Sequence, residues 1–338
     1  MPSTDPITLT AECLCKAHIF TTQVPRSQLP LKASVLFCGT CSTPMFFNNP
    51  QNPEDPGVFT GCLRNIGTDI LRFESHIFVG DTVDGGASVW LQHPNADGSV
   101  AKRYAKRSDG EELPPDWPDP SSMAGFDARS EQESLPIHCR CKGVDFRLHR
   151  SDYLGKRKEE IPWFIDDKNG KMIASFDACD SCRLQAGIDL FYWTFAEMKN
   201  ISFRDGVEGK FPGNIKELAA AVDAGDERMG TLGYYQSSPD VHRYFCKTCS
   251  AVIFFASDRR EEVVDIAVGV LDSADGARAE GFLSWTLGGP VSWAKDFKGG
   301  WREGMLERVV DEAEKWRVGR GYPKNRRRIE SEEMAGGG

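Results

Sequence analysis

Eleven cysteines, most of them in closely spaced pairs, constrain this chain more than any other feature of its sequence. One or two residues separate the members of each pair, which are Cys13/Cys15, Cys38/Cys41, Cys139/Cys141, Cys179/Cys182 and Cys246/Cys249. In a reducing compartment such pairs more often bind metal than form disulfides, and two thiolates in one tight turn can reach a single tetrahedral zinc ion. We therefore expect zinc, with thiol redox chemistry and inert buried thiols as the alternatives. The unpaired Cys62 is expected to lie in the core.

An internal duplication sorts these cysteines into sites. The segment CLCKAHIF at 13–20 matches CRCKGVDF at 139–146, an offset of 126 residues, and FCGTCSTPMFF from position 37 matches FCKTCSAVIFF from position 245, an offset of 208. Each copy thus contains C-x-C followed by F-C-x-x-C, and four cysteines form a closed metal shell with no vacant position for a substrate. We predict two structural sites, formed by Cys13, Cys15, Cys38 and Cys41 and by Cys139, Cys141, Cys246 and Cys249.

The pair Cys179/Cys182 occurs only in the second copy. The offsets of 126 and 208 differ by 82, so the second copy contains 82 more residues between its two motifs, whereas only 22 residues separate Cys15 from Cys38 in the first. This third pair is therefore expected to have a different role. Spacing alone leaves open that Cys139 and Cys141 share a site with Cys179 and Cys182, a pairing that the repeat disfavours.

The pattern of apolar residues predicts a mainly β protein. Short β-branched and aromatic runs, such as AHIFTT, SVLFC, HIFVG and SVWLQ in the first copy, are broken by turn-forming residues. A proline- and acid-rich stretch at 108–134 predicts an exposed linker between a domain at 1–107 and a second at 135–316. Helices are expected at 214–224, where Asn214 can cap, and at 301–316, where apolar residues recur at helical spacing. The tail at 317–338 has few apolar residues and is expected to be disordered.

Charge and hydropathy exclude several classes of function. A formal net charge of -9 argues against a nucleic-acid partner, because such binding depends on lysine and arginine. No run of about eighteen apolar residues is present and the first residues are polar, so we expect neither a membrane span nor a secretory signal. We therefore expect a cytoplasmic protein. The run KNRRR at 324–328 leaves a nuclear location open, although such runs are more often solvated charge.

These motifs resemble those of the glutathione-dependent formaldehyde-activating (GFA) enzymes, which share a domain with centromere protein V. That family has C-x-C, a central C-x-C-x-x-C-R and then F-C-x-x-C. The match covers most of the second copy, from Cys139 to about Leu283, and the two flanks of the first. The resemblance implies two Mss4-like, zinc-containing β domains in tandem, followed here by the C-terminal helix. The outer cysteines would bind structural zinc and the central cysteines a catalytic zinc, which the degenerate first copy would lack.

The central motif departs from the family pattern. The residues are Asp177-Ala178-Cys179-Asp180-Ser181-Cys182-Arg183, with aspartate where the first of three cysteines would stand. A carboxylate can ligate zinc, so Asp177, Cys179 and Cys182 would supply three ligands and leave the open position that catalysis requires. The alternative is that two thiolates are too few and that this site holds no ion.

The family activity is the condensation of formaldehyde with glutathione, which is formally a carbon-sulfur lyase run in reverse. The resemblance therefore implies that the substrate is a small-molecule thiol or thiol adduct such as S-(hydroxymethyl)glutathione. A non-catalytic zinc scaffold that binds a protein, and a specialised reaction unrelated to glutathione, are the alternatives. Arg183 would pair with a substrate carboxylate or with Asp180, and His242 is a conceivable acid or base that is more often structural. We expect the aromatic strand at 191–195 to be buried in the core, with the lining of a pocket by its aromatic side chains as the alternative.

Overall fold

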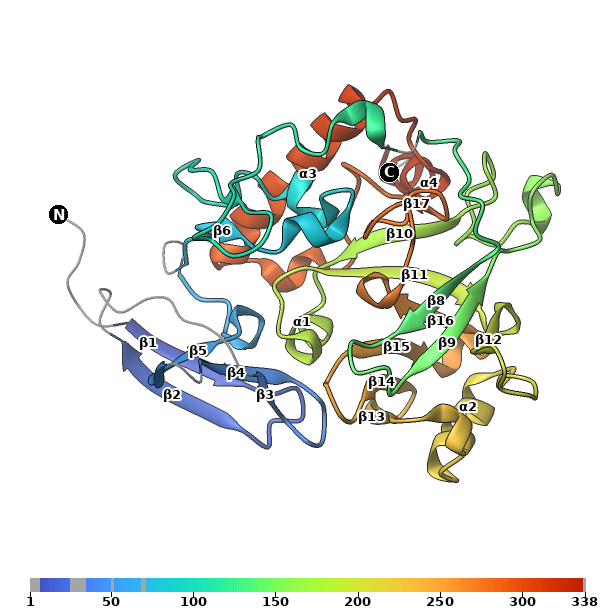
Figure 1. Ribbon diagram of the computed structural model, residues 1–338, viewed down its shortest axis with the longest axis horizontal. Coiled ribbons are helices and arrows are strands. Elements are labelled where there is room, and N and C mark those ends of the chain that lie inside the picture. The colour runs from blue at the N-terminus through green and yellow to red at the C-terminus, as the bar shows by residue number, and fades with distance from the viewer. Residues whose placement is uncertain (1–6, 25–34, 50–51, 68–70, 124, 337–338) are drawn as a thin grey trace.

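The computed structural model describes residues 7–24, 35–49, 52–67, 71–123 and 125–336 and is mainly β, as expected (Figure 1). Its largest sheet has seven strands in the order β13-β14-β15-β16-β11-β10-β17, and only the β10–β17 pair is parallel. The strands are β10 (Met172–Asp177), β11 (Phe191–Glu197), β13 (Leu232–Ser238), β14 (Val241–Cys246), β15 (Val252–Ser257), β16 (Val263–Ala267) and β17 (Leu283–Trp285).

A smaller sheet packs against one face of the large one. It has the order β12-β9-β8, with β8 (Ser134–His138), β9 (Asp145–His149) and β12 (Ile201–Phe203). Phe146 of β9 stacks on Phe254 of β15 at 6.1 Å between ring centroids, and both side chains are fully buried. The main hydrophobic core lies between these sheets, because each turns an alternating row of apolar side chains toward the other.

The N-terminal part forms a smaller β module. It consists of the hairpin β1 (Ile7–Glu12) and β2 (Ile19–Val24) and the sheet β3 (Val35–Phe37), β4 (Pro44–Asn49) and β5 (Asn52–Val58). Its own core, among the described residues, contains only the seven side chains Ala11, Cys13, Cys38, Cys41, Met45, Cys62 and Leu63. The prediction that Cys62 is buried is confirmed. So small an apolar core leaves the module dependent on additional cross-links.

The two copies of the cysteine motifs have the same local backbone. Lys16 and Lys142 share a positive φ of 58°, and the pair Ser42 and Ser250 has values of 61° and 60°. An isolated β-bridge joins Ala11 to Leu63 in the first copy, and its equivalent joins Ile137 to Leu271 in the second. These pairs are related by the offsets of 126 and 208 residues found in the sequence. The repeat is therefore structural and extends beyond the cysteines themselves.

Residues 75–103 of the first copy differ from the expected strands. Of the run HIFVG, only His76 lies in a strand, the two-residue β6 (Ser75–His76), which pairs with β7 (Lys102–Arg103). The run SVWLQ lies largely in a 3-10 helix over Gly86–Trp90. The strand prediction for these runs was wrong because tertiary burial overrides local propensity. Trp90 is 1% exposed and makes edge contacts with Phe176 and Trp285, so this segment contributes to the main core.

Four α-helices complete the described chain: α1 (Asp180–Ala186), α2 (Ile215–Asp223), α3 (Trp301–Gly319) and α4 (Arg326–Gly336). Both predicted helices are confirmed, and the Asn214 side chain accepts a hydrogen bond from the Glu217 amide at 2.9 Å. The apolar residues Trp301, Met305 and Val309 of α3 are buried. No described helix has the length and apolar character needed to span a bilayer. The stretch at 108–134 is mostly exposed and irregular, apart from a 3-10 turn at Pro120–Ser122.

Disorder was the wrong prediction for the C-terminal tail. Helix α4 packs back on the protein near β17, close to the end of α3 (Figure 1). Arg328 is 7% exposed and hydrogen-bonds to the Leu287 carbonyl at 2.6 Å and to the Glu314 carboxylate, while Asn325 is 2% exposed. The basic run KNRRR is therefore not simply solvated charge. Charge-assisted hydrogen bonds, which an apolar-content argument does not consider, hold this segment in place.

Candidate metal centres

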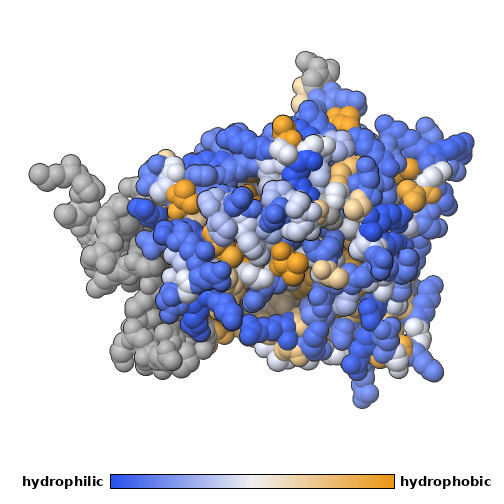
Figure 2. Space-filling view, turned by 45° about the horizontal axis from the view of Figure 1, so that its top comes forward, coloured by the Kyte–Doolittle hydropathy of each residue, from blue (hydrophilic) through white to orange (hydrophobic). Residues whose placement is uncertain are grey.

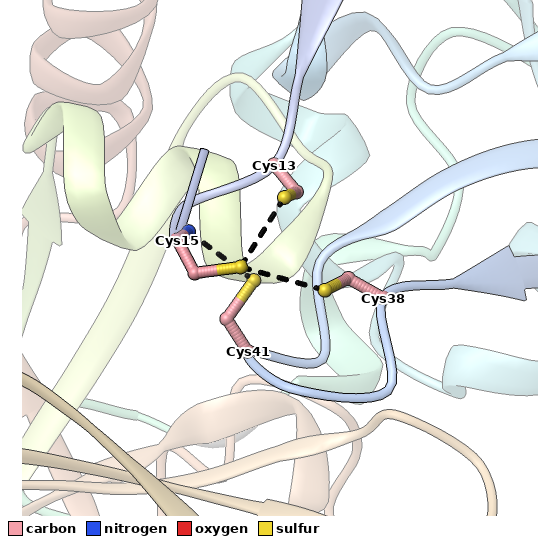
Figure 3. A group of neighbouring side chains, drawn as sticks. All are labelled: Cys13, Cys15, Cys38 and Cys41. Atoms are coloured by element: carbon pink, nitrogen blue, oxygen red, sulfur yellow. Dashed lines mark hydrogen bonds between the residues drawn. The ribbon is translucent and has the colours of Figure 1, made fainter. Parts of the chain in front are cut away.

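Four cysteines of the N-terminal module converge on one point. The Sγ atoms of Cys13, Cys15, Cys38 and Cys41 all lie within 4.8 Å of one another and face inward from two loops (Figure 3). The Sγ of Cys15 lies 3.4 Å from that of Cys13 and 3.6 Å from that of Cys38. A tetrahedral ion with four metal-sulfur bonds of about 2.3 Å has sulfur-sulfur edges of about 3.8 Å. The geometry is therefore suited to a four-thiolate metal site.

The second copy repeats this arrangement. The Sγ atoms of Cys139, Cys141, Cys246 and Cys249 also lie within 4.8 Å of one another. Cys141 is 3.4 Å from Cys139 and 3.5 Å from Cys246, measured between Sγ atoms. The predicted grouping within the second copy is thus the one that the fold brings together, and the alternative with Cys179 and Cys182 is not. None of the eleven cysteines forms a disulfide.

Backbone amides prepare these sulfur atoms for a cation. The amide of Cys15 donates to the Sγ of Cys41 at 3.4 Å, and in the second copy the amide of Val144 donates to the Sγ of Cys139 at 3.4 Å. Burial disfavours the thiolate of Cys246, but hydrogen bonds from Thr231 and nearby amides outweigh it and lower the pKa to about 6. Burial raises the pKa of Cys139 to about 12. Without a cation, a crowded shell of this kind cannot ionise fully, which is the electrostatic behaviour of a metal-binding set.

The third cluster contains Asp177, Cys179 and Cys182. Asp177 ends β10, Cys179 is the N-cap of α1 and Cys182 lies in the first turn of that helix. One ligand atom from each residue lies within 4.8 Å of the others. The amide of Cys179 donates to Oδ1 of Asp177 at 2.8 Å, which orients the carboxylate toward the thiols. The predicted three residues are therefore assembled and geometrically able to hold a metal, and within the described part of the chain no fourth cysteine, histidine or acidic residue belongs to the cluster.

Burial and mutual interactions shift the pKa values of all three residues in the third cluster. Burial, together with the nearby Cys179, raises the pKa of Asp177 to about 7. A hydrogen bond from Cys182 is the main reason that the pKa of Cys179 falls to about 6, and the same interaction raises that of the buried Cys182. Three such groups this close together cannot all ionise without a cation, and a divalent ion would favour the ionised form of all three.

Two arginines that the sequence analysis did not identify lie beside this cluster. Arg243 of β14 is 5% exposed, and its Nη1 donates to the Sγ of Cys182 at 3.6 Å. Arg327 of α4 donates to the hydroxyls of Ser175 at 3.2 Å and Ser292 at 2.9 Å. The only sequence signal that could have placed Arg243 near the cluster was the alternation of side chains along the strand that ends at Cys246. No local signal could have placed Arg327 there, because it lies in α4, far along the chain from the cluster.

Several other expectations are resolved by the structure. Arg183 bonds to the Asp180 carboxylate at 2.8 Å and to carbonyl oxygens of the N-terminal module, including that of Leu63 at 2.9 Å. It is 4% exposed and thus joins the two copies rather than facing a substrate. His242 neighbours Arg243 on β14 and so points to the opposite face of the sheet, where it contacts the Tyr234 ring. His242 is therefore not an acid or base for this cluster.

The aromatic strand β11 is buried, as expected. Phe191, Trp193 and Phe195 are each less than 9% exposed. Phe191 is the register partner of Asp177, so the two residues lie on the same face of the sheet. Pairing with β11 thus fixes the position of Asp177 at the end of β10, beside Phe191.

No protein-family model matches the chain, and no curated protein matches it significantly. The following proposals therefore rest on the sequence motifs and on the geometry of the three clusters.

Proposed function

We propose that the protein is a zinc-dependent enzyme of the GFA type that makes or breaks a carbon-sulfur bond in a small thiol adduct. The two four-cysteine clusters would hold structural zinc within Mss4-like modules. Asp177, Cys179 and Cys182 would hold a third, catalytic zinc. The single observation that carries this proposal is a cluster of three candidate ligands, distinct from two clusters of four; three protein ligands would leave one tetrahedral position for a substrate.

Zinc is favoured by the ligand chemistry. Eight cysteines in two sets of four, each set with its Sγ atoms within 4.8 Å of one another, suit a soft or borderline divalent ion. The mixed carboxylate and thiolate set of the third cluster remains compatible with zinc and is the harder of the three. Because thiols must stay reduced to bind metal, a reducing compartment such as the cytoplasm fits this proposal.

The reaction would join a thiol to an aldehyde carbonyl. The sulfur forms a bond to the carbonyl carbon, the π electron pair moves to oxygen and the thiol proton ends on that oxygen. Zinc would supply a lowered thiol pKa or a polarised carbonyl. Around it, the Cys179 amide holds Asp177 in position, and the hydrogen bond from Arg243 to the Cys182 sulfur would favour the thiolate form of Cys182. The buried sheet face beneath excludes water from one side of the site.

Metal analysis tests this proposal directly. The purified chain is expected to contain about three zinc ions, and the double variant Cys179→Ser, Cys182→Ser about two, because only the third cluster is removed. Cys62→Ser is the matched control, since Cys62 is buried and belongs to none of the three clusters, and it should retain three. Turnover of formaldehyde with glutathione is measured on the same samples.

Two zinc ions in the unaltered chain would favour the alternative, a zinc scaffold for a protein partner. The N-terminal module, which retains a four-cysteine cluster but has no central motif, is the observation behind that alternative. Unchanged stoichiometry in the double variant would refute the third site.

A further inference from the structure

A cavity of about 350 Å³ lies between the two copies, within the range of about 300–1,000 Å³ typical of small-molecule sites. The N-terminal module contributes Pro44 and Phe59 to its wall. The second copy contributes Ala186, Phe191, Val252 and Val270, among others. Neither copy encloses this space alone.

The cavity adjoins the third cluster by two independent routes. Phe191 is the cross-strand partner of Asp177 on the same face of the large sheet. Ala186 follows Cys182 by one helical turn and lies on the same face of α1. Cross-strand and i,i+4 neighbours are separated by about 5–6 Å, so two lining residues are direct neighbours of Asp177 and Cys182, although neither of these lines the cavity itself. Cys249 of the second four-cysteine cluster does line it.

The docking of the copies that forms this cavity is tight. The amide of Gly61 donates to the Gly187 carbonyl at 3.1 Å, directly after α1. A Cβ on Gly61 would lie 2.2 Å from the backbone of Gly187, so no larger residue fits there without a shift. Arg183, the residue next to Cys182, binds carbonyls of the N-terminal module. Helix α1 therefore has the third cluster at its start and the N-terminal module against its flank (Figure 1).

The lining is mainly apolar, and its polar members are Tyr192, Ser250 and Cys249, the last a member of the second four-cysteine cluster. Among the described residues that surround the cavity, none is aspartate, glutamate, lysine, arginine or histidine. Glutathione carries carboxylates and an ammonium group, which would lose hydration here without gaining charged partners. An uncharged aromatic or aliphatic group, by contrast, would exchange water for apolar surface.

We propose that this cavity binds the uncharged, apolar part of the substrate, so that the reacting thiol or thiol adduct is aromatic or aliphatic rather than a charged peptide. The inference rests on the proposed function and deepens it. It also gives the N-terminal module a role, since a copy without a central motif completes the substrate site of the other.

Benzyl alcohol, which has no thiol, tests the cavity apart from the chemistry. Its binding to the zinc-loaded chain is measured by saturation-transfer NMR. Gly269 lines the cavity, has an ordinary φ and would place a Cβ in open space, so Gly269→Leu should fill the cavity without a backbone clash. We expect it to weaken binding about tenfold or more, because an aromatic ring would lose its apolar site.

Gly319→Leu is the matched control, because a Cβ there also meets no atom within 4 Å and Gly319 lies outside the cavity lining, at the end of α3. It should bind benzyl alcohol as the unaltered chain does. Phe59→Ala, which removes part of the wall, should also weaken binding. Unchanged zinc content in all variants verifies folding. Absent binding, or equal binding by the unaltered chain and Gly269→Leu, would overturn the cavity proposal.

Absorption spectra of the cobalt-substituted protein test the substrate preference separately from the proposed thiol chemistry. Benzyl mercaptan should change the cobalt absorption at lower concentration than glutathione does, and Gly269→Leu should remove that preference. If benzyl alcohol binding depends on Gly269 but no thiol perturbs cobalt, the cavity stands and the thiol chemistry fails. If both thiols perturb cobalt equally in both proteins, the chemistry stands and the apolar substrate is refuted.

Discussion

At the scale of single residues, the third cluster depends on side chains outside its own motif. Arg243 is buried, lies over the Phe255 ring at 5.1 Å and has no carboxylate partner within ion-pair distance among the described residues. A buried guanidinium requires compensating negative charge. Arg243 lowers the pKa of Cys179, opposes the rise in the pKa of Cys182 and donates a hydrogen bond to the Cys182 sulfur. The spacing of the cysteines identifies the atoms that can bind metal, whereas Arg243 influences the pKa values of the two thiols in the cluster.

We therefore predict that Arg243→Gln weakens metal binding at the third cluster. Removing a hydrogen-bond donor to a metal ligand typically lowers metal affinity by about 10–100-fold, because the ligand loses charge stabilisation and orientation. Competition of the zinc-loaded protein with a chelator of known affinity measures this loss for the weakest ion. Arg147→Gln, which removes the largely exposed ion pair with Asp205, serves as the control and should leave all three affinities unchanged. Equal affinities in both variants would disprove a role for Arg243.

At the scale of elements, helix α4 is held by charge rather than by an apolar stripe. The carboxylate of Glu314 on α3 bonds to Arg317 at 2.8 Å and to Arg328 of α4. Hydrogen bonds from these two arginines lower the pKa of Glu314 to about 2. Because α4 carries Arg327 to the third cluster, this contact between two helices also determines the charge near Asp177.

Glu314→Gln is expected to destabilise α4 by about 0.5–1 kcal/mol at neutral pH, since the side chain is partly exposed and its ion pairs are screened. A lowered carboxyl pKa stabilises the folded state above the unfolded value of about 4.5, and this contribution is lost as the pH falls toward 2. The difference between the unaltered chain and the variant should thus persist from pH 7 to about 5, decline below about 4.5 and vanish near pH 2. Hydrogen exchange of α4 amides measures it; a difference that is independent of pH would contradict the assignment.

At the scale of the whole molecule, two cores of very different size are joined. The main core contains dozens of buried apolar side chains from both sheets and from α3, and it includes Trp90 from the first copy. Cysteines make up four of the seven buried side chains in the core of the N-terminal module. We therefore expect a metal ion bound by its four-cysteine cluster to supply a large part of the stability of that module, as in other small metal-dependent folds.

Removing metal should consequently affect the two parts unequally. A strong chelator under reducing conditions is expected to abolish hydrogen-exchange protection in β1–β5, while the amides of β10, β11 and β16 keep most of theirs. Adding zinc back should restore the protection. Equal loss throughout the chain, or none at all, would show that the N-terminal module is not held by its metal cluster.

Sequence motifs and their repetition identified the side chains that form the three candidate metal clusters. The repeat and its two offsets were enough to sort eight cysteines into two clusters, because each pair lies within one tight turn whose shape is set by a few residues. The same holds for α2, whose cap and apolar spacing are local. The three members of the central cluster also lie within six residues of one another, so their proximity followed from the motif.

Tertiary structure decided the features that neither the repeat nor any local pattern marks. The 3-10 conformation around Trp90, the order of α4, the contact of Arg243 with Cys182 and the cavity between the copies all arise from packing between distant segments. No local pattern encodes such contacts, because their free energy comes from surfaces that meet only after the chain has folded. The candidate metal ligands could thus be identified from the sequence. The residues that surround these ligands and line the adjoining cavity could not.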